Sequence, residues 1–149
     1  EAVSSMTALN ATASRLMQEA GAHACTDITG FGLLGHAAEM MELSHVGMQL
    51  EWAAVPLLPR VEVLARGGFI PAGAYRNRDF RASQLKLAPG LPDYVREVLF
   101  DPQTSGGLLI ALPKEKARKL VQKLHGAGIT AAAVIGTVLA QPEGIMAIS

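Results

Sequence analysis

Apolar residues recur at helical spacing along three stretches of the chain. Over residues 5–20 they follow three- and four-residue steps, which places them on one face of a predicted helix. Gly21 follows directly and suits the left-handed conformation that commonly ends a helix. A second helix is predicted over residues 33–43. A clearly amphipathic third is predicted between Pro113 and Gly126, with leucines on one side and lysines on the other.

Other stretches alternate or are uniformly apolar, as strands do. Residues 46–52 alternate apolar and polar side chains, which predicts a half-buried strand. The short apolar run at residues 108–112 predicts a buried strand, and residues 130–139 and 144–148 predict the closing strands. A further short strand is expected near residues 82–87.

Proline and glycine divide the rest of the chain. A short helix is expected to end at the glycine pair 67–68, and another to run from Pro92 to about Phe100. Residues 69–89 are predicted to be irregular apart from the short strand. This order of helices and strands favours an α+β layered domain, with helices packed on a mostly antiparallel or mixed sheet.

The composition is that of a folded chain with balanced charge. Apolar residues make up 50% and charged residues 17% of 149 positions, so the chain can bury a core as one domain. A disordered segment is thereby excluded. The 13 basic and 13 acidic residues give zero net charge, which together with only 5% aromatic residues argues against a nucleic-acid partner.

The chain also lacks the signals of a membrane or secreted protein. No apolar run reaches the roughly 18 residues that a membrane span requires. The single cysteine, Cys25, excludes an intramolecular disulfide and fits a reducing compartment such as the cytoplasm. The chain starts at Glu1 without a signal segment, so we expect it either to begin inside a longer protein or to have been trimmed.

Two loops concentrate the side chains that bind phosphate and metal. Residues 25–36 and 101–107 each combine one carboxylate with hydroxyl residues and glycines. Glycine lets a backbone approach a ligand closely, and a carboxylate suits a hard cation such as Mg²⁺. Asp27 and its neighbours also precede a predicted helix, whose first amides can face an anion. Both loops are therefore candidate ligand sites.

Each loop also has a purely structural explanation. Asp27 or Thr29 could cap the helix that begins near Phe31, and the surrounding glycines could serve a tight turn. In the second loop, the step from Asp101 to Pro102 is a common way to open a turn. Residue chemistry alone leaves the two explanations open.

Isolated reactive side chains elsewhere favour packing over chemistry. Cys25 lies in an apolar run, which favours an inert thiol. His36 lies beside leucines of a predicted helix and is typical of a packing histidine. The three arginines within residues 76–81 either grip phosphate or form a solvated loop. The glycines within residues 30–35 match G-x-G-x-x-G, but no Rossmann unit surrounds them.

Two longer motifs resemble signatures of one enzyme family. Residues 26–36, Thr-Asp-Ile-Thr-Gly-Phe-Gly-Leu-Leu-Gly-His, and residues 101–109, Asp-Pro-Gln-Thr-Ser-Gly-Gly-Leu-Leu, resemble signatures of the selenophosphate synthetases. Residues 71–77 are similar to a looser glycine-rich segment of that family, which ends in Arg-Asn. Related enzymes such as aminoimidazole ribonucleotide synthetase share the fold, but their loops do not usually carry the first motif.

The resemblance implies one domain of a larger subunit. The family has two-domain subunits, and residues 1–149 are similar to the C-terminal domain, a layered α/β/α fold with partial ferredoxin-like topology. The family's N-terminal domain, with its catalytic cysteine or selenocysteine and its lysine, has no counterpart in these residues. The implied reaction converts ATP, selenide and water to selenophosphate, AMP and phosphate, in a cytoplasmic homodimer.

The resemblance also implies site residues. Asp27 matches the carboxylate that helps to hold Mg²⁺ against the phosphates of ATP, and Thr26, Thr29, Gly30 and Gly32 match supporting residues of the nucleotide-binding loop. The second motif receives no role beyond shaping the cleft. No catalytic residue is expected in this chain, which alone would bind Mg-ATP only weakly. The alternative is an isolated non-catalytic domain or a related enzyme such as aminoimidazole ribonucleotide synthetase.

Overall fold

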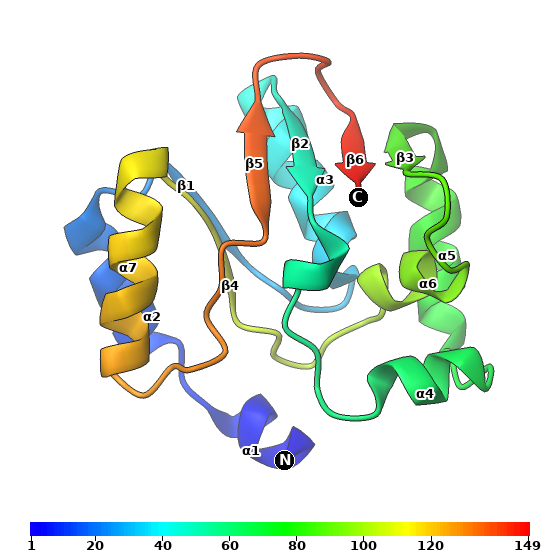
Figure 1. Cartoon of the computed structure of the whole chain (residues 1–149), viewed down its shortest axis with the longest axis horizontal. Coiled ribbons are helices and arrows are strands. Elements are labelled where there is room, and N and C mark those ends of the chain that lie inside the picture. The colour runs from blue at the N-terminus through cyan, green and yellow to red at the C-terminus, as the bar shows by residue number, and fades with distance from the viewer.

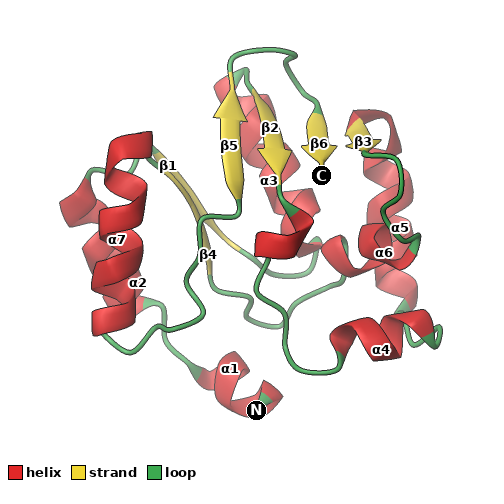
Figure 2. Ribbon diagram, in the orientation of Figure 1, coloured by secondary structure: helices red, strands yellow, loops and turns green.

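Six strands form two separate sheets in the computed structural model, which describes all residues from 1 to 149 (Figure 2). The strands are β1 (Ala24–Asp27), β2 (Gly47–Leu50), β3 (Leu85–Leu87), β4 (Leu108–Ala111), β5 (Gly136–Leu139) and β6 (Met146–Ile148). The helices are α1 (Ala2–Thr7), α2 (Ala11–Ala20), α3 (Gly32–Ser44), α4 (Val61–Arg66), α5 (Ala72–Arg81), α6 (Tyr94–Leu99) and α7 (Lys114–Gly126), with 3-10 turns η1 (Trp52–Ala54) and η2 (Ala82–Gln84).

The larger sheet is mixed, in the order β3-β6-β2-β5. β2 pairs antiparallel with β5 and parallel with β6, and β3 pairs parallel with β6. Helices accompany the sheet, so the predicted α+β class with a mixed sheet is confirmed. No helix of the chain is both long enough and apolar enough to cross a membrane.

The alternation predicted for residues 46–52 decides which face of this sheet is covered. Met48 and Leu50 are buried, while Gln49 between them is exposed. The register places Met146 opposite Met48 and Ile148 opposite Leu50, so these four side chains share one face. They join a 13-residue core to which α3 and α6 also contribute. The opposite face carries Gln49, Thr137 and Lys86 together with the apolar Ala147 and Leu139.

A second, smaller core lies at the other side of the molecule, where α2 and α7 pack together (Figure 1). It contains three buried residues, Leu16, Leu120 and Leu124. The two inward leucines of α7 were predicted from its amphipathic pattern, and both predictions are confirmed. The β1–β4 ribbon runs between the two cores, as Figure 1 shows.

Several predicted elements differ from the structure. Residues 25–27, expected to belong to a loop, lie in β1. The helix predicted over 5–20 is two helices, because the chain is extended at Ala8 and α1 buries no side chain that would hold it in line with α2. Residues 72–81, predicted to be irregular, form α5, which begins after Pro71 at a position that tolerates proline. The strand predicted over 130–139 begins only at Gly136.

Candidate functional site

The two motifs lie side by side because β1 and β4 are antiparallel neighbours. Thr26 lies opposite Leu109 and Asp27 opposite Leu108. Backbone hydrogen bonds continue past the strand ends: Ile28 and residues 106–107 exchange bonds of 2.8 and 2.9 Å, and the Gln103 amide donates to the Thr29 carbonyl at 3.0 Å. Residues 27–32 and 101–107 therefore form one unit, called here the paired loops.

Asn77 of α5 holds the paired loops from a third segment. Its side-chain amide donates to the Gly30 carbonyl at 2.9 Å and to the Phe100 carbonyl at 3.1 Å. Asn77 thus reaches the first motif at Gly30 and the residue just before the second, and a Cβ at Gly73 of the same helix would lie 2.7 Å from the Pro102 side chain. Arg76 is exposed and forms no ion pair.

The glycines of the first loop do different work. Gly32 has φ +71°, and a Cβ there would lie 2.6 Å from the Phe100 carbonyl carbon, so only glycine fits without movement. At Gly30, by contrast, a Cβ would meet no atom within 4 Å, so the backbone there faces open space. Gly32 supports the loop against α6, and Gly30 leaves its surface open.

Asp27 has a free carboxylate at the end of β1. The residue is exposed, and its side chain forms no hydrogen bond or ion pair within the chain. α3 begins after Phe31 without any side-chain cap, so the explanation in which Asp27 or Thr29 caps this helix is wrong. Thr26, half-buried beside it, donates from its hydroxyl to the Asp27 carbonyl at 3.2 Å. The Asp27 carboxylate is therefore available to a ligand.

Thr29 begins a row of three hydrogen-bonded side chains. Its Oγ1 lies 3.1 Å from Nε2 of His36, and Nδ1 of His36 lies 3.1 Å from Oε2 of Glu39. His36 is 7% exposed, and the Phe31 ring lies 5.4 Å from its own ring. The predicted packing role of His36 is confirmed, because it is buried with both nitrogens satisfied. The hydrogen bond between His36 and Glu39 could not be predicted from the motif, because Glu39 lies outside residues 26–36.

Asp101 of the second loop is turned into the structure. Burial raises the pKa of its carboxyl, and a hydrogen bond of 2.8 Å from the Gln103 side-chain amide acts in the opposite direction. Gln103 also donates to the Asp101 carbonyl at 3.1 Å. These contacts stabilise the turn, so the side-chain geometry favours the structural explanation for Asp101.

Cys25 precedes the site on β1 and is half-buried. Burial raises the pKa of its thiol, and the nearby Asp27 carboxylate raises it further. A thiol with a raised pKa is a poor nucleophile. The surroundings of Cys25 therefore favour the predicted inert thiol.

The paired loops offer oxygen atoms, the ligands that Mg²⁺ prefers. Asp27 supplies a free carboxylate, with hydroxyl groups of Thr26 and Thr29 close to it in the sequence. No group of three or more histidine, cysteine or acidic residues gathers anywhere in the chain. The residues fit a hard cation, but this chain supplies only part of a complete site.

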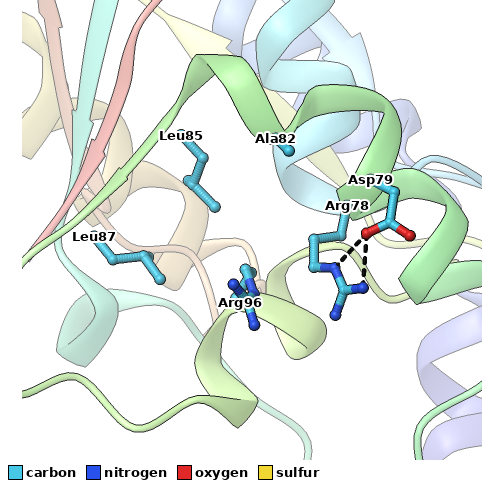
Figure 3. Close-up of a pocket in the computed structure, with 6 residues that line it drawn as sticks. All are labelled: Arg78, Asp79, Ala82, Leu85, Leu87 and Arg96. Atoms are coloured by element: carbon cyan, nitrogen blue, oxygen red, sulfur yellow. Dashed lines mark hydrogen bonds and ion pairs between the residues drawn. The ribbon is translucent and has the colours of Figure 1, made fainter.

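The arginines of α5 are occupied elsewhere. Arg78 lies against Asp79, as Figure 3 shows. The two residues line a hollow of about 440 Å³ whose lining includes no residue of the paired loops. Arg78 also pairs with Glu97 at 2.8 Å, and Arg81 pairs with Glu42 at 2.6 Å. These two guanidinium groups therefore neutralise the protein's own carboxylates, so the geometry does not favour phosphate binding, one of the two alternatives left open for them.

Fold and paired loops together define an α+β domain whose two glycine-rich loops present one free carboxylate. The sequence profile of the family described as AIR synthase related protein, C-terminal domain, matches residues 3–149. The chain belongs to this family.

Curated relatives are proteins named selenide, water dikinase. That of Pelobacter propionicus is 48% identical over 94% of this chain, and that of Rhizobium meliloti is 42% identical over all of it. Selenide, water dikinase 2 of Peptoclostridium acidaminophilum is 43% identical over 96% of the chain. The matches cover 40%, 43% and 41% of these proteins, so the chain spans about two fifths of their length. The resemblance to selenophosphate synthetases is confirmed.

Proposed function

We propose that residues 1–149 are the C-terminal domain of a two-domain selenophosphate synthetase, which converts ATP, selenide and water to selenophosphate, AMP and phosphate. The observation that carries the proposal is the pairing of the two motifs into one unit around the free carboxylate of Asp27. Similarity to proteins named selenide, water dikinase over nearly the whole chain supports the same reaction.

In this proposal Asp27 is a metal ligand. A bound Mg²⁺ neutralises phosphate charge and positions the phosphates for transfer. The exposed Asp27 carboxylate has no internal partner, so it holds the ion without breaking any existing contact. Thr26, Thr29 and the open backbone at Gly30 line the nucleotide side, and Gly32 supports the loop from behind. The catalytic residues belong to the N-terminal domain.

The proposal also places the parent protein in the cytoplasm as a homodimer, with its own N-terminal domain as the main partner of this chain. One half-buried thiol suits a reducing compartment. Zero net charge fits small-molecule substrates, because a phosphate held locally by Mg²⁺ and loop amides needs no global positive charge.

The test is Asp27→Asn in the full-length protein. We expect the rate of selenophosphate formation from ATP and selenide to fall by about 100-fold or more. Asparagine has the same size as aspartate but lacks the negative charge that binds the metal. Glu51→Gln is the matched control, since Glu51 is also exposed and unpaired but lies outside the paired loops. Wild-type activity in the Asp27 variant would show that this carboxylate does not bind the metal.

A second measurement concerns the 149-residue chain alone. One carboxylate rarely holds Mg²⁺ well, so calorimetry should detect no Mg-ATP binding at micromolar concentrations. Tight binding would mean that this chain contains a more complete site than Asp27 provides. A full-length protein that uses ATP but ignores selenide would instead favour another reaction, such as that of aminoimidazole ribonucleotide synthetase.

A further inference from the structure

Thr29, His36 and Glu39 form a hydrogen-bonded chain that leads from the paired loops into α3. Thr29 belongs to the loop, and His36 and Glu39 lie one turn apart on the helix. Both contacts measure 3.1 Å, and both involve ring nitrogens of the same histidine. The protonation of this ring therefore decides which way each hydrogen bond points.

The carboxylate of Glu39 determines the first direction. An ionised carboxylate can only accept hydrogen bonds, so Nδ1 of His36 must carry a proton and donate it to Glu39. In a neutral imidazole only one nitrogen is protonated, which leaves a lone pair on Nε2. The hydroxyl of Thr29 is the group that faces this lone pair, so it donates its proton to His36.

We infer that His36 is a positioning residue: it accepts the hydroxyl proton of Thr29 in a hydrogen bond. The Thr29 oxygen then offers only acceptor lone pairs to the ligand. This inference rests on the proposed function for the identity of the ligand. A phosphate oxygen is itself an acceptor and cannot pair with such a group. Thr29 is therefore specific for a donor, such as a water molecule bound to the metal, and does not contact the phosphate directly.

The surroundings keep this arrangement in place. His36 is buried, whereas the side chain of Glu39 is 42% exposed and stays in contact with water. The Phe31 ring lies at 5.4 Å from the imidazole and tilts by 46° against it. Burial of His36 limits the exchange of its partners with water, which makes one tautomer dominant.

The donor and acceptor in each of these two hydrogen bonds can be identified by NMR on the ¹⁵N-labelled protein at pH 8, where ordinary histidines are neutral. Long-range ¹H–¹⁵N correlations should show His36 protonated at Nδ1 and bare at Nε2. His125 is an internal reference of opposite type, because its Nε2 lies 2.8 Å from the Ala132 carbonyl and must donate. A His36 ring protonated at Nε2, or at both nitrogens, would overturn the inference.

Glu39→Gln tests the cause of that direction. A glutamine amide can either accept or donate, so it no longer forces a proton onto Nδ1. We expect the His36 tautomers to mix in this variant, while the fold survives because glutamine has the same size and the side chain at this position is 42% exposed. An unchanged single tautomer would show that Glu39 does not control the ring.

The functional consequence is tested in the full-length protein with His36→Asn, Thr29→Val and the double variant. Asparagine is too short to reach Thr29, so the apparent KM for Mg²⁺ should rise about fivefold, more than kcat falls. In the Thr29→Val background the same change should add nothing, because the hydroxyl that it controls is gone. Additive effects would reveal a merely structural role. The NMR result decides the proton direction even where the proposed reaction is wrong.

Discussion

Gly30 and Gly32 stand two positions apart in one loop but differ in what surrounds them. Gly32 has a positive φ, and a Cβ at this residue would meet the backbone of Phe100. A Cβ at Gly30 would face open space. Both glycines belong to the same motif, so the motif alone could not separate a packing requirement from an open ligand surface.

Replacing each glycine by alanine separates these roles. Gly32→Ala should lower the free energy of unfolding by about 2–4 kcal/mol, because the new Cβ meets the Phe100 carbonyl in a strained backbone conformation. Gly30→Ala should change it by less than about 1 kcal/mol. Urea denaturation measures both, and equal losses would mean that the close approach at Gly32 relaxes freely.

At the level of single residues, the family resemblance pointed to Asp27, whereas residue chemistry alone left its role open and did not identify its neighbours in space. A carboxylate between hydroxyl residues and glycines is visible in the sequence. The roles of Asn77 and Glu39 depend on which distant atoms they reach, and the spacing of residues along the chain does not encode those distances. The site was therefore predictable as two loops, but not as one hydrogen-bonded unit.

Among the elements, α5 shows how tertiary contacts override local pattern. The helix is polar and largely exposed, and its one buried residue is Ala74. Side chains tie it to the rest of the molecule, since Asn77 bonds to the paired loops and Arg78 pairs with Glu97 of α6. The amphipathic α7, by contrast, was predicted correctly because its leucines recur on one face.

The contact between α5 and α6 can be tested through its ion pair. Glu97 is 6% exposed, and hydrogen bonds from Arg78 to Asp79 and Glu97 raise the pKa of the guanidinium, so it stays charged. Arg78→Gln should lower the free energy of unfolding by about 2–3 kcal/mol, because it leaves Glu97 with Arg96 as its remaining cation.

The matched control for that variant is Arg15→Gln. Arg15 pairs with Glu19 at 2.6 Å on α2, but both side chains are well exposed, so the loss should stay below about 0.5 kcal/mol. Urea denaturation of the two variants gives the comparison. A similar small loss for both would show that the α5–α6 pair contributes no more than a surface contact.

At the scale of the whole molecule, two cores of unequal size share one chain. The larger contains 13 buried residues and the smaller three, with the β1–β4 ribbon between them (Figure 1). Few buried apolar contacts mean a low free energy of local opening. The α2–α7 pair should therefore open more readily than α3 and β2.

Hydrogen exchange measures this difference in the free energy of local opening. Amides of α2 and α7 should exchange on the order of 100-fold faster than those of α3, by openings that leave the larger core intact. Amides in the middle of each helix should be compared, because helix ends fray regardless of the core. Uniform protection across the chain would indicate that both cores unfold together.

The pairing of β1 with β4 also determines when the paired loops can form during synthesis. Asp27 is synthesised before its partner Leu108, which follows only after α3 to α6 have been made. Contacts between such distant segments close slowly and late. A growing chain thus carries the free carboxylate of Asp27 without the second loop while α3 to α6 are made, and the paired loops can form only after β4 has followed.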